Sequence, residues 1–271
     1  MVCAELGPSR LGFKPGRRLR GVVCTLIVAW QAFEDTPIAV VANRDELYAR
    51  GSRPPAVESS ELRIVAPRDE EAGGTWLGYN EAGVVVAITN RWVESPDGGR
   101  SRGLLVRDAL HRYSAEDAAR FVERELDERD YGPFHLLVAD ADAALLLAWD
   151  GVGNGPVHVE NLVPGVHTVV NVGWNGSYFV PERRPGVGEK QAEDTERVRA
   201  VIRPEPGEPA TEWTGRVRGI VADHEYGRCI HGEEFGTKSA SVVRLGPEGG
   251  VFEHAEGPPC ETPFEVVEAP F

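Results

Sequence analysis

Cys24 and the polar run Asn-Arg-Asp-Glu at 43–46 are the residues whose types and spacing best suit catalysis. Cys24 opens a short apolar run rich in β-branched residues, 24–30, and a second such run, 37–43, leads into Arg44 and Asp45. The two runs predict a hairpin of buried strands. Because the second strand of an antiparallel hairpin returns to the start of the first, the sequence predicts that Arg44 and Asp45 lie beside Cys24.

A cysteine at the first position of a chain carries its own general base. Its α-amine titrates near pH 7.7–8.0 and can accept the thiol proton. A neighbouring cation such as Arg44 favours the thiolate further. An amide nitrogen cannot act as a base, so Cys24 has its catalytic partner only where residues 1–23 are absent. The alternative is an inert core cysteine, the commoner role of a lone strand cysteine.

Residues 1–22 lack hydrophobic periodicity, and we expect a disordered tail, a propeptide or a misassigned start, with a single domain at 23–271. Three explanations compete for the tail. It is removed as a propeptide, translation starts at Val23 through a GTG codon, or the tail is retained and the site is inert. We favour the start at Val23, because the tail resembles neither a folded nor a specific segment.

The composition indicates a solvated, acidic protein. Forty-three acidic residues outnumber 29 basic ones, which gives a formal net charge of −14, and only three of the basic residues are lysines. This balance is typical of proteins adapted to high salt, as in a halophile, with a surface acidity that has no such purpose as the alternative. It argues against a nucleic-acid partner. The sequence has no apolar run of membrane-spanning length and no secretory cleavage pattern, so we expect a soluble cytoplasmic protein with no membrane span.

Cysteine and histidine spacing gives no metal motif. Cys3, Cys24, Cys229 and Cys260 lack a CxxC pair and indicate free thiols in a reducing compartment. His224 and His231 are too far apart for a helical pair. We therefore expect no metal site.

The order of elements predicts the fold class. Hairpins at 24–43 and 73–90 precede helices at 101–113 and 114–128. Strands then come at 134–140, 143–149 and 163–171, helices at 189–202 and 212–222, and closing strands from 239 onwards. This alternation favours an α+β protein, a four-layer αββα sandwich of two antiparallel sheets flanked by helices.

The ordered segments CTLIVAWQ, VVANRDE, GGTWLGYNEAGVVVAITNR, HTVVNVGWN and FGTKSAS resemble the NRDE family, the transport and Golgi organisation protein 2-like group. The resemblance runs from Cys24 to about Leu245. It implies an N-terminal-nucleophile (Ntn) hydrolase-like αββα fold. It also implies a nucleophilic cysteine that normally stands second, behind only the initiator methionine.

A more distant similarity reaches the penicillin V acylase and bile-salt hydrolase group, Cys-first enzymes that cleave amides. It implies that Arg44 and Asp45 orient the cysteine and substrate, although an alignment through Asn43 and Glu46 is also possible. The implied catalytic residues are Cys24, Arg44, Asp45, Asn90 and Asn171, the two asparagines as oxyanion donors. The implied substrate-binding residues are Asn43, Glu46, Trp76, Arg91 and Lys238.

Ordinary structural roles remain open for several of these residues. A strand-end asparagine such as Asn90 or Asn171 is commonly a turn former, and Trp76 suits a core or pocket wall. Lys238 stands where the NRDE pattern more often has arginine, so it keeps the charge but loses bidentate carboxylate recognition.

Two functions follow as expectations. The first is hydrolysis of a linear carbon–nitrogen amide bond in a small molecule, by Cys24 with its α-amine as base. The alternative is a non-catalytic protein that binds or traffics haem or a lipid or acyl group in the same cleft. We expect no resident cofactor, with haem only as a carried ligand. The substrate and the oligomeric state stay open.

Overall fold

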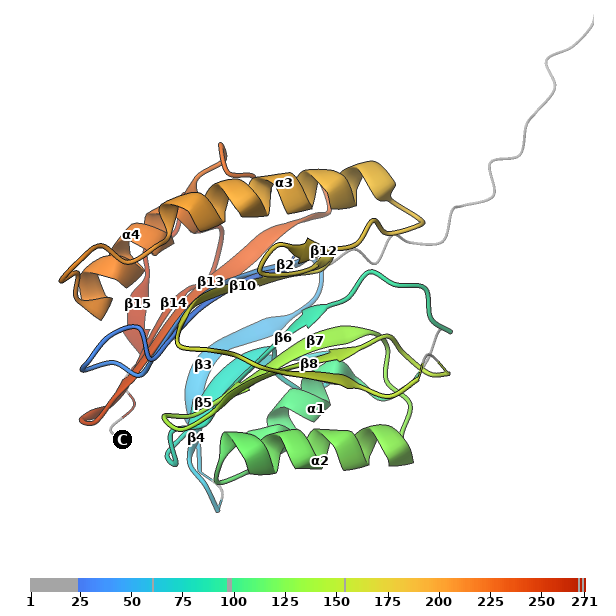
Figure 1. The fold of residues 1–271 in the computed structure, drawn as a ribbon, viewed down its shortest axis with the longest axis horizontal. Coiled ribbons are helices and arrows are strands. Elements are labelled where there is room, and N and C mark those ends of the chain that lie inside the picture. Colours follow the sequence, from blue (N-terminus) through green and yellow to red (C-terminus); the bar gives the residue numbers. More distant parts are fainter. Residues whose placement is uncertain (1–23, 60, 97–98, 154, 268, 270) are drawn as a thin grey trace, which may run out of the picture.

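The computed structural model describes residues 24–59, 61–96, 99–153, 155–267, 269 and 271 (Figure 1). The predicted tail at 1–22 and the predicted start at Val23 lie outside the described residues.

Two antiparallel sheets form the middle of the molecule, as the sequence predicted. The first sheet has the strand order β12-β11-β10-β1-β2-β13-β14-β15, and the second has the order β3-β4-β5-β6-β7-β8-β9. The strands of the first sheet are β1 (Cys24–Trp30), β2 (Ile38–Leu47), β10 (Gly165–Val170), β11 (Gly173–Trp174), β12 (Ser177–Tyr178), β13 (Phe235–Gly246), β14 (Gly249–Ala255) and β15 (Glu265–Val267). Those of the second are β3 (Ser52–Glu58), β4 (Ile64–Asp69), β5 (Leu77–Asn80), β6 (Val85–Asn90), β7 (Phe134–Ala139), β8 (Ala144–Trp149) and β9 (His158–Asn161).

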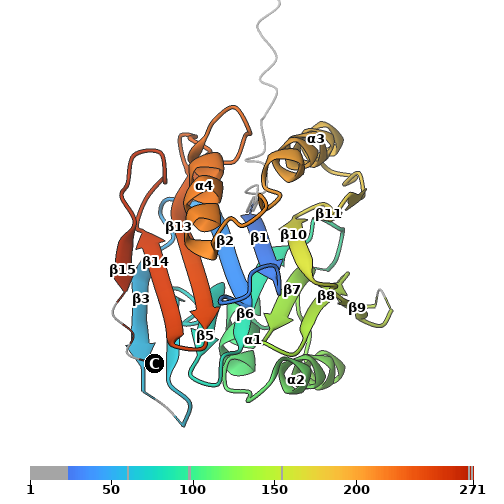
Figure 2. The ribbon, with the colours of Figure 1, turned by 60° about the vertical axis from the view of Figure 1, so that its left-hand side comes forward.

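Helices cover the outer faces of both sheets. In the described residues they are α1 (Arg102–Ala109), α2 (Ala115–Glu128), α3 (Pro185–Val201) and α4 (Ala210–Ala222). Helices α1 and α2 lie against the second sheet, and α3 and α4 lie against the first (Figures 1 and 2). The Ser114 side chain caps α2 by accepting the Asp117 N–H, as its position predicted. The four-layer αββα sandwich is therefore confirmed. No helix among the described residues combines the length and the apolar character needed to cross a membrane.

The hairpin of β1 and β2 forms as predicted, with Cys24 opposite Arg44 in the register. The second strand does not end at Asn43 but continues to Leu47. Its extension pairs with β13, where Phe235 lies opposite Leu47. The polar run at 43–46 is thus part of a strand that has a partner on both sides.

The sequence analysis missed five strands, namely β3, β4, β9, β11 and β12. The segment around Gly51, Pro54 and Pro55 was expected to be a loop, but residues 52–58 form β3, followed by β4. Strand β3 lies at the edge of its sheet, and its register shifts between Arg53 and Ala56. Prolines are tolerated at such edges and bulges because no ladder hydrogen bond is lost there.

The layers fix which side chains of β1 and β2 meet. Leu26 and Val28 pack between the two sheets, whereas Ile27 and Ala29 pack against α3 and α4. Because side chains alternate along a strand, Cys24 continues the inter-sheet side. On β2, Val40 packs between the sheets and Val41 against the helices. Arg44 and Glu46 therefore continue the inter-sheet side, and Asn43 and Asp45 the helix side.

Candidate functional site

Cys24 lies at the start of β1, buried with 8% of its surface exposed. Its backbone N–H donates a hydrogen bond of 3.0 Å to Oδ1 of Asn171. Asn171 directly follows β10, the strand that pairs with β1 on the side opposite β2. Cys24 thus has Arg44 of β2 across the register on one side and Asn171, just after the end of β10, on the other.

The Asn171 amide is held in one orientation. Its Oδ1 accepts from Nε2 of Gln191 at 3.0 Å as well as from Cys24, and its Nδ2 donates to the backbone carbonyl of Asn90 at 2.7 Å. Asn171 is fully buried. The two predicted oxyanion residues are therefore in contact, but Asn90 contributes its carbonyl to that contact. An acceptor on the Cys24 nitrogen would hold an α-amine in a defined position.

Arg44 lies in a partly neutralised, aromatic environment. Its guanidinium carbon lies 4.1 Å from the centre of the Trp76 ring, and its Nη2 is 3.2 Å from Oδ2 of Asp69 and 3.9 Å from Oε2 of Glu46. The Nη1 nitrogen is buried and has no hydrogen-bond partner among the residues that the structure describes. A buried N–H group without a partner costs free energy, so this donor is available for a ligand acceptor.

Glu46 and Lys238 lie near Arg44, and each of them also forms hydrogen bonds with backbone groups. Oε1 of Glu46 accepts from the Leu47 backbone N–H at 2.9 Å. The Lys238 ammonium donates to the backbone carbonyls of Tyr48, at 3.1 Å, and Arg50. Burial lowers the pKa of Lys238, and the nearby positive charge of Arg44 lowers it further.

Asn43 and Asp45 point toward the helix layer. Nδ2 of Asn43 donates to the backbone carbonyls of Val221 and Arg228, both at 2.9 Å. Asp45 accepts a hydrogen bond of 2.5 Å from Oγ1 of Thr237. Through these contacts, Asn43 and Asp45 connect β2 to α4, to the segment that precedes β13 and to β13 itself. The sequence analysis left open an alignment through Arg44 and Asp45 and another through Asn43 and Glu46. The structure puts one residue of each pair, Arg44 and Glu46, on the inter-sheet side with Cys24.

Burial dominates the titration of the two acidic groups at this end of the strands. It raises the pKa of the Asp45 carboxyl to about 8, although the Thr237 hydrogen bond and the Arg228 charge act in the opposite direction. Burial also raises the pKa of the Cys24 thiol to about 12, and the charge of Asp45 adds to that rise. Arg44 favours the thiolate as expected, but its effect is smaller than that of burial. The thiol therefore needs a base.

Three further residues at the site were missed in the sequence. Asp69 binds Arg44, Gln191 binds Asn171, and Arg228 donates to Oγ1 of Thr25 at 3.2 Å. Only 2% of the Arg228 surface is exposed. Each lies on a segment remote in sequence from its partner, so no local pattern signals them.

Arg91 is occupied by other contacts. Its side chain forms an ion pair with Asp150, lies 2.9 Å from Nε2 of His135 and stacks over the Phe179 ring at 4.6 Å. Burial lowers the pKa of His135 to about 3, so this imidazole is neutral and accepts from the guanidinium. The structure gives Arg91 a place beside β7 and β8 and no described contact with Cys24.

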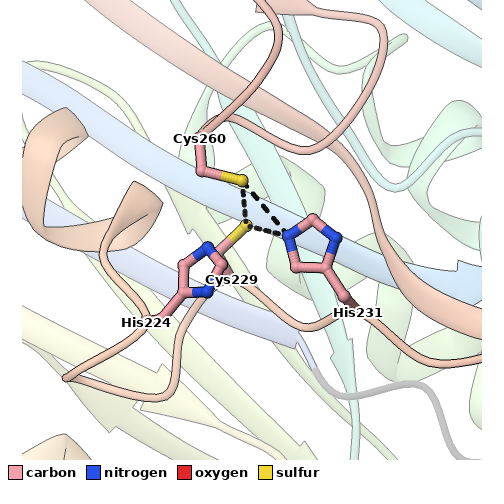
Figure 3. Close-up of side chains that lie close together, drawn as sticks. All are labelled: His224, Cys229, His231 and Cys260. Carbon is pink, nitrogen blue, oxygen red and sulfur yellow. Dashed lines mark hydrogen bonds between the residues drawn. The ribbon is translucent and has the colours of Figure 1, made fainter.

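A second cluster lies apart from these residues. His224, Cys229, His231 and Cys260 present ligand atoms that all lie within 4.8 Å of one another (Figure 3). The spacing of these residues gave no metal motif, and only the folded chain brings them together.

Residues 23–252 match the family model described as Transport and Golgi organisation 2. A Transport and Golgi organization protein 2 homolog of Bos taurus is 27% identical over 239 residues, which cover 79% of this chain and 84% of the relative. The Mus musculus homolog is 34% identical over 109 residues, 38% of each chain. The solved structure of penicillin V acylase from Agrobacterium tumefaciens has a TM-score of 0.52 at 13% identity, over 90% of this chain and 84% of that one. That similarity is one of fold, the Ntn-hydrolase fold. The chain belongs to the Transport and Golgi organisation 2 family.

Proposed function

We propose that this protein, in a form whose first residue is Cys24, hydrolyses a linear amide bond in a small molecule, with the Cys24 thiol as nucleophile. The observation that carries the proposal is the 3.0 Å hydrogen bond from the Cys24 nitrogen to Oδ1 of Asn171. That bond uses only one hydrogen of the Cys24 nitrogen. If the nitrogen is an α-amine, its lone pair is therefore free to accept the proton of the thiol.

The reaction proceeds in two halves. The α-amine takes the thiol proton, and the sulfur attacks the amide carbon. Collapse of the tetrahedral intermediate breaks the carbon–nitrogen bond, and the ammonium returns its proton to the leaving amine. Water, deprotonated by the same amine, then attacks the thioester carbon and releases the carboxylic acid and the free thiol.

The intermediate carries a negative oxygen that needs a donor. Nδ2 of Asn171 has two hydrogens, one of which is bound to the Asn90 carbonyl. We assign the second to the oxyanion. A preorganised amide donor at such a position typically contributes about 10²–10³-fold in rate. Asn90 then acts by orienting Asn171 through its carbonyl.

Arg44 and Trp76 are proposed to bind the substrate beside the nucleophile. Nη1 of Arg44 is a buried donor without a partner among the described residues, and the same guanidinium lies over the Trp76 ring. A substrate that offers a carbonyl or carboxylate oxygen satisfies this donor and shares the aromatic surface. The penicillin V acylase with a similar fold is named as an acylase, which agrees with this substrate class. A reducing compartment such as the cytoplasm, where we propose that the protein acts, keeps Cys24 a thiol.

The test compares two forms of the protein. One begins at Cys24, released by a site-specific protease from a fusion, and the other is the full chain. Intact mass and N-terminal sequencing establish the first residue of each. Each form is then assayed for amine release from a panel of N-acyl amides that differ in acyl chain and in charge.

We expect turnover in the Cys24-first form and none in any form in which the Cys24 nitrogen is an amide. Cys24→Ala abolishes turnover in the first form while its circular dichroism spectrum is retained. Equal rates in the two forms, or turnover in Cys24→Ala, would falsify the assignment of the nucleophile. Alkylation by iodoacetamide gives a second measurement, because the amine should accelerate the reaction of Cys24 in the Cys24-first form.

A further inference from the structure

Four potential metal ligands converge at the surface beside the N-terminal end of β13. Cys229 is buried, and His224, His231 and Cys260 are exposed. Figure 3 shows the two thiols and the His231 ring pointing toward one another, with the His224 ring beside Cys229. The set of two thiols and two imidazoles is a typical donor set for zinc.

The separations of the ligand atoms suit one bound ion. The two Sγ atoms are 3.4 Å apart, and Nε2 of His231 lies 3.5 Å from Sγ of Cys229 and 3.2 Å from Sγ of Cys260. In a tetrahedral site with zinc–sulfur bonds near 2.3 Å and zinc–nitrogen bonds near 2.0 Å, these atoms lie about 3.5–3.8 Å apart. The three atoms therefore already occupy three corners of such a site to within a few tenths of an ångström.

His224 is the candidate for the fourth ligand position. Its ring centre is 5.0 Å from that of His231, with the two ring planes tilted by 31°. A turn in which the Gly227 N–H donates to the His224 carbonyl brings this residue back toward Cys229. Gly227 has a φ of +61°, a conformation that glycine adopts without a steric cost.

The chain supplies the other ligands from two more fixed segments. The backbone of His231 forms a bridge with Gly236 on β13. Cys260 lies in the turn after β14 in which the Glu261 and Thr262 N–H groups both donate to the Pro258 carbonyl. Ligands that are held by separate, hydrogen-bonded segments form a preorganised site.

We propose that His224, Cys229, His231 and Cys260 bind one zinc ion. All four ligands come from the protein, so the site is closed and structural, without an open position for a substrate. Two thiolates balance the charge of the cation. Thiolate and imidazole together favour zinc over magnesium or calcium, which prefer oxygen ligands.

The ion would fix the segment that holds the polar residues of β2. The carbonyl of Arg228, which immediately precedes a ligand, accepts from Asn43 at 2.9 Å. The Ile230 N–H, between two ligands, donates to Oγ1 of Thr237, the same hydroxyl that donates to Asp45. The metal site thus stabilises one side of the strand that carries Arg44. It is independent of whether Cys24 reacts.

The experiment measures the metal directly. The full chain, purified from cells grown with zinc and without chelator or affinity histidines, is analysed by inductively coupled plasma mass spectrometry. We expect one zinc per chain. After removal of zinc by a chelator under reducing conditions, Co²⁺ is added, and we expect the visible absorption of tetrahedral cobalt with a thiolate-to-metal charge-transfer band. Removal of zinc should also lower the melting temperature.

Substitutions test whether the metal binds at this cluster. Cys260→Ser and His231→Gln change exposed side chains and should each weaken zinc binding by at least tenfold. The matched controls are Cys24→Ser and His158→Gln, a cysteine and an exposed histidine outside the cluster, which should retain one zinc per chain.

Three results would overturn the proposal. In the first, the wild-type protein neither contains zinc nor binds Co²⁺. In the second, peptide mapping finds a Cys229–Cys260 disulfide in protein purified in the presence of reductant. In the third, both cluster variants keep their full zinc content. If a cluster variant fails to fold, the cobalt spectrum of the wild-type chain still decides, because charge-transfer intensity reports the number of thiolate ligands. None of these measurements depends on amide turnover.

Discussion

Arg44, on β2, and Asn171, directly after β10, flank Cys24 on its two sides. Asn171 binds the Cys24 nitrogen and Arg44 lies opposite it in the register. Asp45, the neighbour of Arg44, is turned to the other face of the sheet, where Thr237 binds it. Adjacent residues in a strand therefore make separate sets of contacts, because successive side chains point to opposite faces.

The first prediction at this scale concerns Asn171. Asn171→Ala removes the acceptor of the Cys24 nitrogen and the proposed oxyanion donor. We expect kcat/KM of the Cys24-first form to fall by about 10²–10³-fold. The matched control is Asn161→Ala, an exposed asparagine on β9, which should leave kcat/KM unchanged. A rate within twofold of the wild type for Asn171→Ala would remove this residue from the mechanism.

The second prediction concerns the pH dependence of stability. The pKa of Asp45 rises from 3.8 to about 8 in the folded protein. Between these values the folded state binds more protons than the unfolded state, so the contribution of Asp45 is complete below about pH 4 and is lost as pH rises through 8. Asp45→Asn should remove this loss, which is on the order of a few kcal/mol.

Urea denaturation at pH 5 and pH 9 measures the effect. The difference in unfolding free energy between the two pH values should be smaller in Asp45→Asn than in the wild type. Asp142→Asn, at an exposed aspartate in a turn, is the control and should not change it. An identical pH dependence in Asp45→Asn and wild type would show that the buried carboxyl does not titrate in this range.

Strand β13 connects the two clusters at the scale of secondary structure. It pairs with β2 along the polar run and also approaches the segment that carries Cys229 and His231. Its register shifts between Thr237 and Ser239, at the position of Lys238. Such bulges redirect side chains, and here the bulge directs the Lys238 ammonium to the carbonyls after β2.

Gly236 allows the close approach of β13 to this segment, and we predict that Gly236→Ala is destabilising. A Cβ atom there would lie 2.4 Å from the Ile230 carbonyl oxygen and 2.1 Å from the Tyr48 hydroxyl. We expect a loss of roughly 1–3 kcal/mol, typical of overpacking. The control is Gly219→Ala on α4, where a Cβ meets no atom of the described residues within 4 Å. It should stabilise by about 0.5–1 kcal/mol through helix propensity. Equal melting temperatures for the two variants would contradict the packing argument.

At the scale of the whole molecule, the net charge of −14 is a source of repulsion in the folded state. Screening shortens the reach of this repulsion from about 10 Å at 0.1 M salt to about 3 Å at 1 M. We predict that the melting temperature rises by several degrees between these KCl concentrations. Sucrose at matched osmolality controls for solvent effects that do not involve charge. A lower melting temperature at 1 M than at 0.1 M KCl would mean that the surface ion pairs outweigh the net repulsion.

Binding or trafficking of haem or a lipid by the same fold stays a prediction. Optical titration with haem tests it.

The sequence by itself determined what depends on neighbours along the chain. The apolar runs of β1 and β2, joined by a short polar connection, fix a hairpin, and the hairpin places Arg44 opposite Cys24. The order of hairpins and helices likewise determined the four layers. Short-range pairing costs little loop entropy, so local patterns specify it.

Only the tertiary structure decided which residues from remote segments complete the two clusters. Arg228 is 203 positions from Thr25, and Cys260 is 31 positions from Cys229. It also showed that Asp45 faces the helices and Glu46 the inter-sheet side, which required knowledge of which face each layer covers. Contacts of this kind depend on how whole layers pack, and no spacing in a single sequence records that packing.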